Sequence, residues 1–334
     1  MTLRKVLLLV GALVVTAIVL TACGAPGPAG PAGPAGSAGP AGPVASVADL
    51  TCTQCHNDTN LIAGKANSWA SSVHGSGPAT AYAGGRADCA GCHSGGGFSA
   101  AMVAGKSNAE PQESADPNPS RINCRACHNI HTSYTDDDWA LKTTTAVKLV
   151  ALDATYDGGM GNLCANCHQQ RTAFPEAKDG LVNVSSTHWG GHHGPEAALL
   201  LGVGGGGGVE GKPSTHYSMV ENTCVTCHLG SADANANHSF MPVVTTCVAC
   251  HADATSLDIN GKQTEIKDKL EKVAEALKAK GLLDKDGAPV VGDYPEAQAA
   301  ALWNYLFVEE DKSEGVHNMT YANALLDAAL EALK

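Results

Sequence analysis

The stretch from Cys52 to His251 contains six copies of one pentapeptide, Cys-x-x-Cys-His, which together hold twelve of the thirteen cysteines. The copies are Cys52-Thr-Gln-Cys55-His56, Cys89-Ala-Gly-Cys92-His93, Cys124-Arg-Ala-Cys127-His128, Cys164-Ala-Asn-Cys167-His168, Cys224-Val-Thr-Cys227-His228 and Cys247-Val-Ala-Cys250-His251.

Two thiols separated by two residues can form thioethers with the two vinyl groups of one porphyrin, and the next residue then lies under the iron. A single copy could also be a zinc site, a disulfide or a thioredoxin-like redox pair. A tetrahedral zinc site would need the pairs to combine and would not need histidine after every second cysteine. The six copies therefore predict six covalently bound haem c groups, with the motif histidines as proximal iron ligands.

The histidines outside the motifs are the candidates for the opposite side of each iron. There are eight of them: His74, His131, His188, His192, His193, His216, His238 and His317. Six haems with two histidines each need six such distal ligands, so the supply covers the demand with two to spare. The candidates for these six positions are His74, His131, His188, His193, His216, His238 and His317, and the sequence leaves open which of them are not ligands.

Two local contexts sharpen the choice of distal ligands. His131 follows His128 by three residues, so it cannot bind the same iron but can reach a neighbouring haem. His192 and His193 are adjacent and point in different directions. The sequence favours His193 as the ligand, and leaves its neighbour to hydrogen-bond a propionate or a ligand ring nitrogen.

The sequence predicts a mainly α-helical fold with a large irregular content, in which the haems form the core and the regular helices lie in the C-terminal segment. Only 4 % of the 334 residues are aromatic and 38 are glycine, so the stretch between Cys52 and His251 has few large side chains for a core. Six porphyrins would supply the missing apolar bulk. The net charge of −12 becomes more negative with the haem propionates, so nucleic acid is not expected as a partner.

Residues 1–22 resemble an export signal, with Arg4 and Lys5 before an uncharged apolar run. The boundary Leu20-Thr-Ala-Cys23-Gly24 resembles a bacterial lipobox, which predicts acylation of Cys23 and a membrane anchor through N-terminal lipid, in the outer membrane or at the cell surface. The alternative is a retained N-terminal anchor helix in which the cysteine is incidental.

Residues 23–48 contain seven Gly-x-y triplets between Gly24 and Val44, many with proline. This is the collagen period, but seven triplets are few for a triple helix, so an extended polyproline-II spacer is the favoured interpretation. Self-assembly as a collagen-like trimer or a filament is the alternative.

The remaining chain divides into a predicted hexahaem region, 49–258, and a helical segment, 259–334, that packs on it and supplies His317 as a distal ligand. Ile266, Leu270, Val273 and Leu277 repeat at helical spacing, and two further helices are predicted from Pro295 and from about Met319. The run Gly204–Gly208 is predicted to be a mobile loop.

The chain resembles multihaem c-type cytochromes of the nitrite reductase, hydroxylamine oxidoreductase and cytochrome c554 kind, and their non-catalytic relatives. Besides the haem motifs, the resemblance rests on Cys-His-Asn-Ile-His at 127–131, His-x-Gly-x-His-His-Gly-Pro at 188–195 and Asp-Lys-Ser-Glu-Gly-Val-His-Asn at 311–318. Nitrite reductases of that kind usually bind their catalytic haem through a motif that ends in lysine, and this sequence has none.

The sequence thus favours an electron carrier over an enzyme. Iron with histidine on both sides cannot bind a substrate without losing a ligand, so it exchanges electrons with little rearrangement. The predicted partners are other cytochromes or extracellular electron acceptors. The alternatives are an oxidoreductase that acts on a small nitrogen or sulfur compound at one open haem, and a subunit of a polymeric haem wire.

Overall fold

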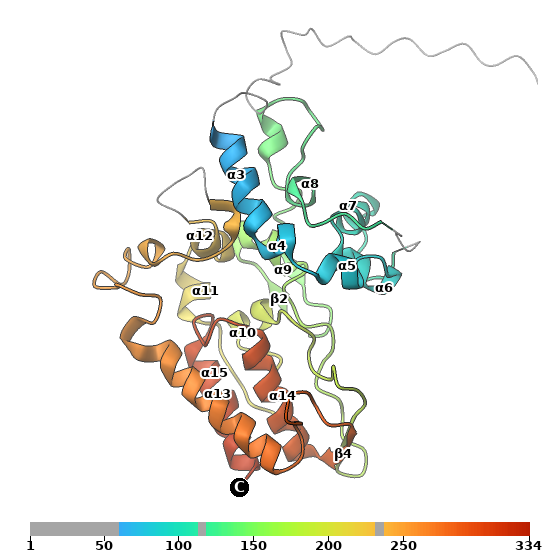
Figure 1. Ribbon diagram of the computed structural model, residues 1–334, viewed down its shortest axis with the longest axis vertical. Coiled ribbons are helices and arrows are strands. Elements are labelled where there is room, and N and C mark those ends of the chain that lie inside the picture. Colours follow the sequence, from blue (N-terminus) through green and yellow to red (C-terminus); the bar gives the residue numbers. More distant parts are fainter. Residues whose placement is uncertain (1–59, 113–117, 231–236) are drawn as a thin grey trace, which may run out of the picture. The chain divides into compact units, whose positions relative to one another are not determined.

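The computed structural model describes residues 60–112, 118–230 and 237–334 (Figure 1). The first haem motif, Cys52–His56, lies outside the described residues. So do the signal-like segment, Cys23 and the Gly-x-y stretch.

Short helices and long irregular segments make up the described residues between 60 and 261, and longer helices follow. The helices are α3 (Asn60–Ser71), α4 (Val73–Ser76), α5 (Ala79–Ala83), α6 (Ala87–His93), α7 (Gly95–Ala104), α8 (Cys124–Cys127), α9 (Asn162–Ala165), α10 (Glu196–Leu201), α11 (Thr215–Met219), α12 (Cys224–His228), α13 (Lys262–Ala279), α14 (Glu296–Glu310) and α15 (Met319–Ala332). The 3₁₀ turns are η2 (Asp136–Trp139), η3 (Gly159–Gly161), η4 (Asn237–Ser239), η5 (Val244–Thr246) and η6 (Ile259–Gly261). No helix in the described ranges is long and apolar enough to cross a membrane.

Two small antiparallel sheets complete the secondary structure of the described ranges. Strand β1 (Val147–Lys148) pairs with β2 (Thr155–Tyr156). Strand β3 (Leu181–Val184) pairs with β4 (Gly292–Pro295), and Val182 lies opposite Tyr294. The second sheet joins the middle of the chain to the segment that precedes α14.

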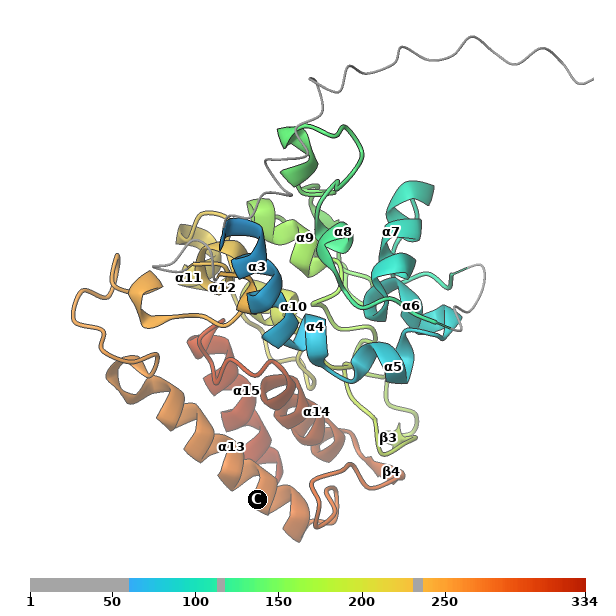
Figure 2. The same ribbon diagram turned by 45° about the horizontal axis from the view of Figure 1, so that its top comes forward.

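The three C-terminal helices, whose presence the sequence pattern predicted, lie side by side in both views (Figures 1 and 2). Ile266, Val273 and Leu277 form the fully buried stripe of α13, because residues three or four apart share one face of a helix. Helix α14 is buried around most of its circumference, and α15 buries Leu325 and Leu326. These helices supply many of the buried apolar residues of the described core.

This core extends into the region between the fourth and fifth haem motifs. Trp303 of α14 is 1 % exposed and contacts Trp189 and Phe174 edge-on, with ring centroids 5.3 and 5.6 Å apart. Its indole N–H donates to the carbonyl of Gly204 at 2.9 Å. Residues 147–201 and 266–333 therefore share one apolar core.

The expectation that the haem-motif region has too few large side chains to fill a core does not hold for residues 147–201, whose apolar side chains pack on the C-terminal helices. It describes residues 60–141 better. There, a small separate cluster forms around Phe98 and Ala126, with Leu163 from the following segment.

The prediction that Gly204–Gly208 is mobile was also wrong. The N–H of Gly205 donates to the Tyr321 hydroxyl at 2.9 Å, and that of Gly206 donates to Asn304 Oδ1 at 2.7 Å. Glycine is needed because the chain runs tightly over the core: a Cβ on Gly204 would lie 2.1 Å from Gln170 Oε1, and its φ of +97° suits no other residue well. The run is a packed segment that fixes α14 and α15.

Candidate haem-binding sites

The haem motif forms one helical turn, in which the first cysteine, the second cysteine and the histidine occupy positions i, i+3 and i+4. Residues at this spacing lie on one face of a helix. The backbone N–H of the histidine donates to the backbone carbonyl of the first cysteine. This hydrogen bond runs from His128 to Cys124 at 2.8 Å in the third motif and from His251 to Cys247 at 2.8 Å in the sixth. The turn thus presents two thiols and one imidazole to the same side.

Each motif histidine in the described ranges faces a histidine from outside the motifs. The distances between ring centroids are 6.0 Å for His93 and His192, 6.3 Å for His128 and His238, 6.1 Å for His168 and His74, 6.2 Å for His228 and His317, and 6.3 Å for His251 and His216. The partners come from different parts of the chain, and the five distances are nearly equal.

These distances fit two imidazoles on opposite sides of one iron. A bond from an imidazole nitrogen to a metal is about 2 Å long, and the ring centre lies roughly 1.1 Å beyond that nitrogen for ring bonds of about 1.33 Å. Two such ligands have centroids about 6.2 Å apart. The five observed pairs span 6.0 to 6.3 Å, so the residues present suit a haem between each pair.

The second ring nitrogen of several of these histidines is hydrogen-bonded, which fixes both the ring and its tautomer. The Nδ1–H groups of three rings donate to backbone carbonyls: His128 to Trp139 at 2.7 Å, His228 to Phe240 at 2.8 Å and His216 to Val316 at 2.7 Å. Nδ1 of His238 lies 2.9 Å from Asn237 Oδ1. Nδ1 of His168 lies 3.2 Å from Glu196 Oε1, and Nδ1 of His317 lies 2.6 Å from Asp311 Oδ1. Nε2 is left for a metal.

The electrostatic surroundings divide the histidines into two kinds. Burial lowers the pKa of His74 and of His238 to about 4. The carboxylate of Glu196 instead raises the pKa of His168 to about 9. Burial alone would lower the pKa of His317, but Asp311 outweighs it and raises that pKa to about 9. Two imidazoles therefore lie in a negative field.

The sequence favoured His193 over its neighbour, but the structure has His192 opposite His93. The His193 side chain is 71 % exposed and its Nδ1 lies 2.7 Å from Glu310 Oε2. The difference arises in the backbone, because His192 has a φ of +75° that turns the loop between the two residues.

His131 and His188 face no motif histidine among the described residues. Nδ1 of His131 accepts a hydrogen bond from Arg125 at 3.1 Å, and its ring stacks on Tyr134 with centroids 5.5 Å apart. His188 is exposed, and its backbone N–H donates to Ser186. His56, the histidine of the first motif, is outside the described residues.

Thiols of different motifs meet in two places. Cys92 and Cys167 are within hydrogen-bonding reach of each other, and the side-chain amide of Asn108 contacts both, at 3.1 and 3.4 Å. Cys164 and Cys224 are likewise within reach of each other. All ten cysteines in the described ranges are free thiols. The second, fourth and fifth motifs thus have neighbouring attachment points.

Nothing in the sequence pointed to the residues that hold the ligand rings. Glu196 follows Pro195 at the start of α10, and Asp311 ends α14, so both look like ordinary helix-terminal acids. Within the described ranges no three or more His, Cys, Asp or Glu side chains gather as a metal site of their own.

The chain matches no family model and no curated protein. Its fold is similar to the crystal structure of the outer cell wall cytochrome OcwA, with a TM-score of 0.54 and 23 % sequence identity over 81 % of this chain. The chain spans 50 % of the length of that protein. At this identity the likeness establishes the fold, and the predicted helical fold with large irregular content is confirmed. The narrower resemblance to the nitrite reductase and cytochrome c554 group stays a prediction.

Proposed function

We propose that this protein transfers electrons through a series of covalently bound haems, each held between two histidines. The observation that carries the proposal is the set of five histidine pairs with nearly equal centroid distances of 6.0 to 6.3 Å. Haem c supplies one-electron redox chemistry at its iron. The fold similarity to OcwA, which is itself a cytochrome, supports the same class of function.

In this proposal the residues of the chain fix the surroundings of each iron. Histidine on both sides leaves no coordination position for a substrate, so the site favours electron exchange over catalysis. The hydrogen bonds from Nδ1 of His128, His228 and His216 keep the rings in place when the charge changes. Little reorganisation is then needed for each transfer.

A continuous path for electrons is supported by the neighbouring thiols. The Cys92–Cys167 and Cys164–Cys224 contacts join the second motif to the fourth and the fourth to the fifth. The order in space therefore differs from the order in sequence, since the third motif is passed over in this series. Phe240 approaches two further ligands, with its ring centroid 4.7 Å from His74 and 6.0 Å from His238.

One haem remains, the one attached at Cys52 and Cys55 of the first motif. It takes its distal ligand from the three histidines that face no described motif histidine. These are His131, His188 and His193. We favour His131, because it follows His128 by three residues, from where it cannot bind the same iron but can reach a neighbouring haem. This haem completes the proposed series of six.

The proposed function is tested by counting and characterising the haems. We expect intact mass and alkaline pyridine spectra of the purified protein to give six haems per chain, because all six motifs are complete. The electron paramagnetic resonance spectrum of the oxidised protein is expected to contain only low-spin signals. A high-spin signal together with enzymatic turnover of nitrite or hydroxylamine would contradict the carrier function.

We further propose that the protein works at the cell surface, anchored by lipid on Cys23, and passes electrons to partner cytochromes or extracellular acceptors. The lipobox-like sequence around Cys23 and the Gly-x-y spacer support the anchor, and the cell-wall location of OcwA supports the surface.

Cys23→Ser is expected to release the protein from membranes or to leave residues 1–22 attached. Detergent partitioning and N-terminal mass measure this, with Cys52→Ser, which removes a thiol of a haem motif, as the control that keeps partitioning unchanged. Unchanged partitioning of Cys23→Ser would refute the lipid anchor.

A further inference from the structure

The five histidine pairs differ in what their second ring nitrogens contact. His128, His216 and His228 donate to backbone carbonyls, which are neutral. His168 and His317 instead lie against carboxylates, those of Glu196 and Asp311. His168 belongs to the fourth motif and His317 faces the fifth, so the two carboxylates back two sites whose thiols, on Cys164 and Cys224, meet.

Both carboxylates are withdrawn from water. The Asp311 side chain is 0 % exposed, and Ser313 donates to it from both its hydroxyl and its backbone N–H. The Glu196 side chain is 21 % exposed, and its Oε2 is buried without a hydrogen-bond partner. A buried anion is costly unless a positive charge lies close by.

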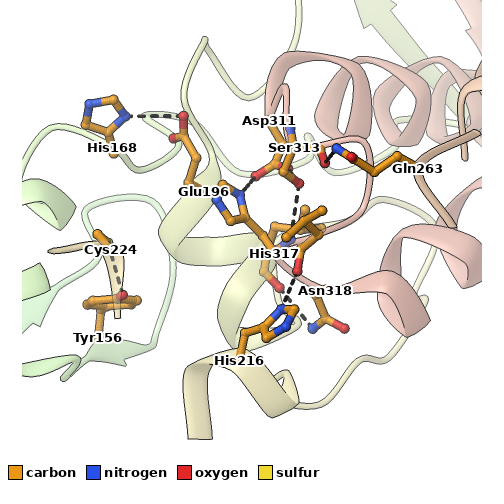
Figure 3. Close-up of polar contacts among 12 residues, drawn as sticks. Tyr156, His168, Glu196, His216, Cys224, Gln263, Asp311, Ser313, His317 and Asn318 are labelled. Atoms are coloured by element: carbon orange, nitrogen blue, oxygen red, sulfur yellow. Dashed lines mark hydrogen bonds and ion pairs between the residues drawn. The ribbon is translucent and has the colours of Figure 1, made fainter. Parts of the chain in front are cut away.

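The two carboxylates lie next to the imidazoles of the fourth and fifth haem sites. Figure 3 shows the carboxylate of Glu196 between the imidazoles of His168 and His317, with Asp311 on the other side of His317. Glu196 interacts electrostatically with both rings. No lysine or arginine forms an ion pair with either carboxylate within the described ranges. A positive charge at the two haem sites would balance these carboxylates.

We propose that Glu196 and Asp311 are positioning residues that lower the reduction potentials of the haems at the fourth and fifth motifs, which makes these neighbours the lowest-potential pair among the five described sites. This inference rests on the proposed function. Oxidised iron carries one positive charge more than reduced iron, so a nearby anion favours the oxidised state. A carboxylate that accepts from Nδ1–H also makes the imidazole a stronger donor to iron, which acts in the same direction.

The consequence is an uneven path. Electrons that enter at other sites fill the higher-potential haems first, and this pair is reduced last. A transfer that passes through the pair then uses two sites that hold an electron only briefly.

The test is a potentiometric titration of the complete haem-loaded protein, followed by visible absorbance and electron paramagnetic resonance. Glu196→Gln and Asp311→Asn keep the side-chain shape and remove the charge. We expect each to raise the lowest midpoint potentials enough to increase the ratio of reduced to oxidised haem at least tenfold at a fixed potential, which corresponds to about 59 mV. All signals should stay low-spin.

Glu310→Gln is the matched control, because Glu310 contacts the exposed His193, which faces no described motif histidine. It should leave the lowest potentials unchanged. An equal shift in this control, or low-spin Glu196→Gln and Asp311→Asn proteins with unchanged potentials, would overturn the inference.

Glu196→Gln or Asp311→Asn could displace the histidine that the carboxylate contacts, His168 or His317, from the iron. Two charge-retaining variants cover that case. Glu196→Asp and Asp311→Glu retain the charge and are expected to keep the low potentials, and a rise in both would overturn the inference. Failure of the proposed function is recognised separately, since it would appear in the wild type as high-spin or missing haems.

Discussion

His317→Ala is expected to convert one of the low-spin haems to a high-spin haem that binds carbon monoxide, which the wild type should not bind. His317 faces His228 with ring centroids 6.2 Å apart, and its loss leaves the iron at the fifth motif with one histidine. Electron paramagnetic resonance and difference absorbance spectra measure the change. His317→Gln, which can still donate to the buried Asp311, should give the same result.

His193→Ala serves as the control for this experiment. Its ring contacts Glu310 and faces no described motif histidine, and His131 is the favoured ligand for the haem at the first motif, so we expect all signals of His193→Ala to remain low-spin. If His317→Ala left the spectra unchanged, His317 would be a structural residue of the C-terminal segment and not a ligand.

Trp303→Ala is expected to lower the free energy of unfolding by about 3–5 kcal/mol, as large-to-small changes of buried aromatic residues do. Trp303 is 1 % exposed, packs on Trp189 and Phe174, and donates to the Gly204 carbonyl. The change therefore removes ring contacts and leaves that carbonyl without its donor. Denaturant unfolding followed by far-ultraviolet circular dichroism measures it.

Val291→Ala provides the comparison, because this side chain is 57 % exposed and such surface substitutions usually change stability by less than about 0.5 kcal/mol. A similar loss in both variants, or a loss below about 1 kcal/mol for Trp303→Ala, would show that the shared core is not what holds α14 in place.

The parts of the fold that follow from short-range patterns could be predicted from the sequence. The apolar spacing of Ile266, Val273 and Leu277 gave α13, and Gly281, with a φ of +74°, follows its end. The attachment motifs were equally local, because two thiols and an imidazole need only one helical turn. Each of these predictions uses contacts within a few residues.

The arrangement over long distances could not be predicted in the same way. Whether His192 or His193 faces His93 depends on one backbone angle, and both residues carry the same side chain. The glycine run is fixed by Tyr321 and Asn304 from two distant helices. Without those helices in place, five consecutive glycines indicate only a flexible segment.

The histidine pairs also bear on how the chain becomes organised. His128 and His238, like His93 and His192, come from distant parts of the sequence, so a metal between two such residues acts as a cross-link. Closing a loop of about 100 residues removes unfolded-state entropy worth roughly 4.7 kcal/mol in the chain-entropy account of disulfides. Residues 60–141 hold only a small apolar cluster around Phe98 and Ala126. We therefore expect these residues to become ordered through the cofactors, which cross-link the chain only after the histidines from later in the sequence have bound.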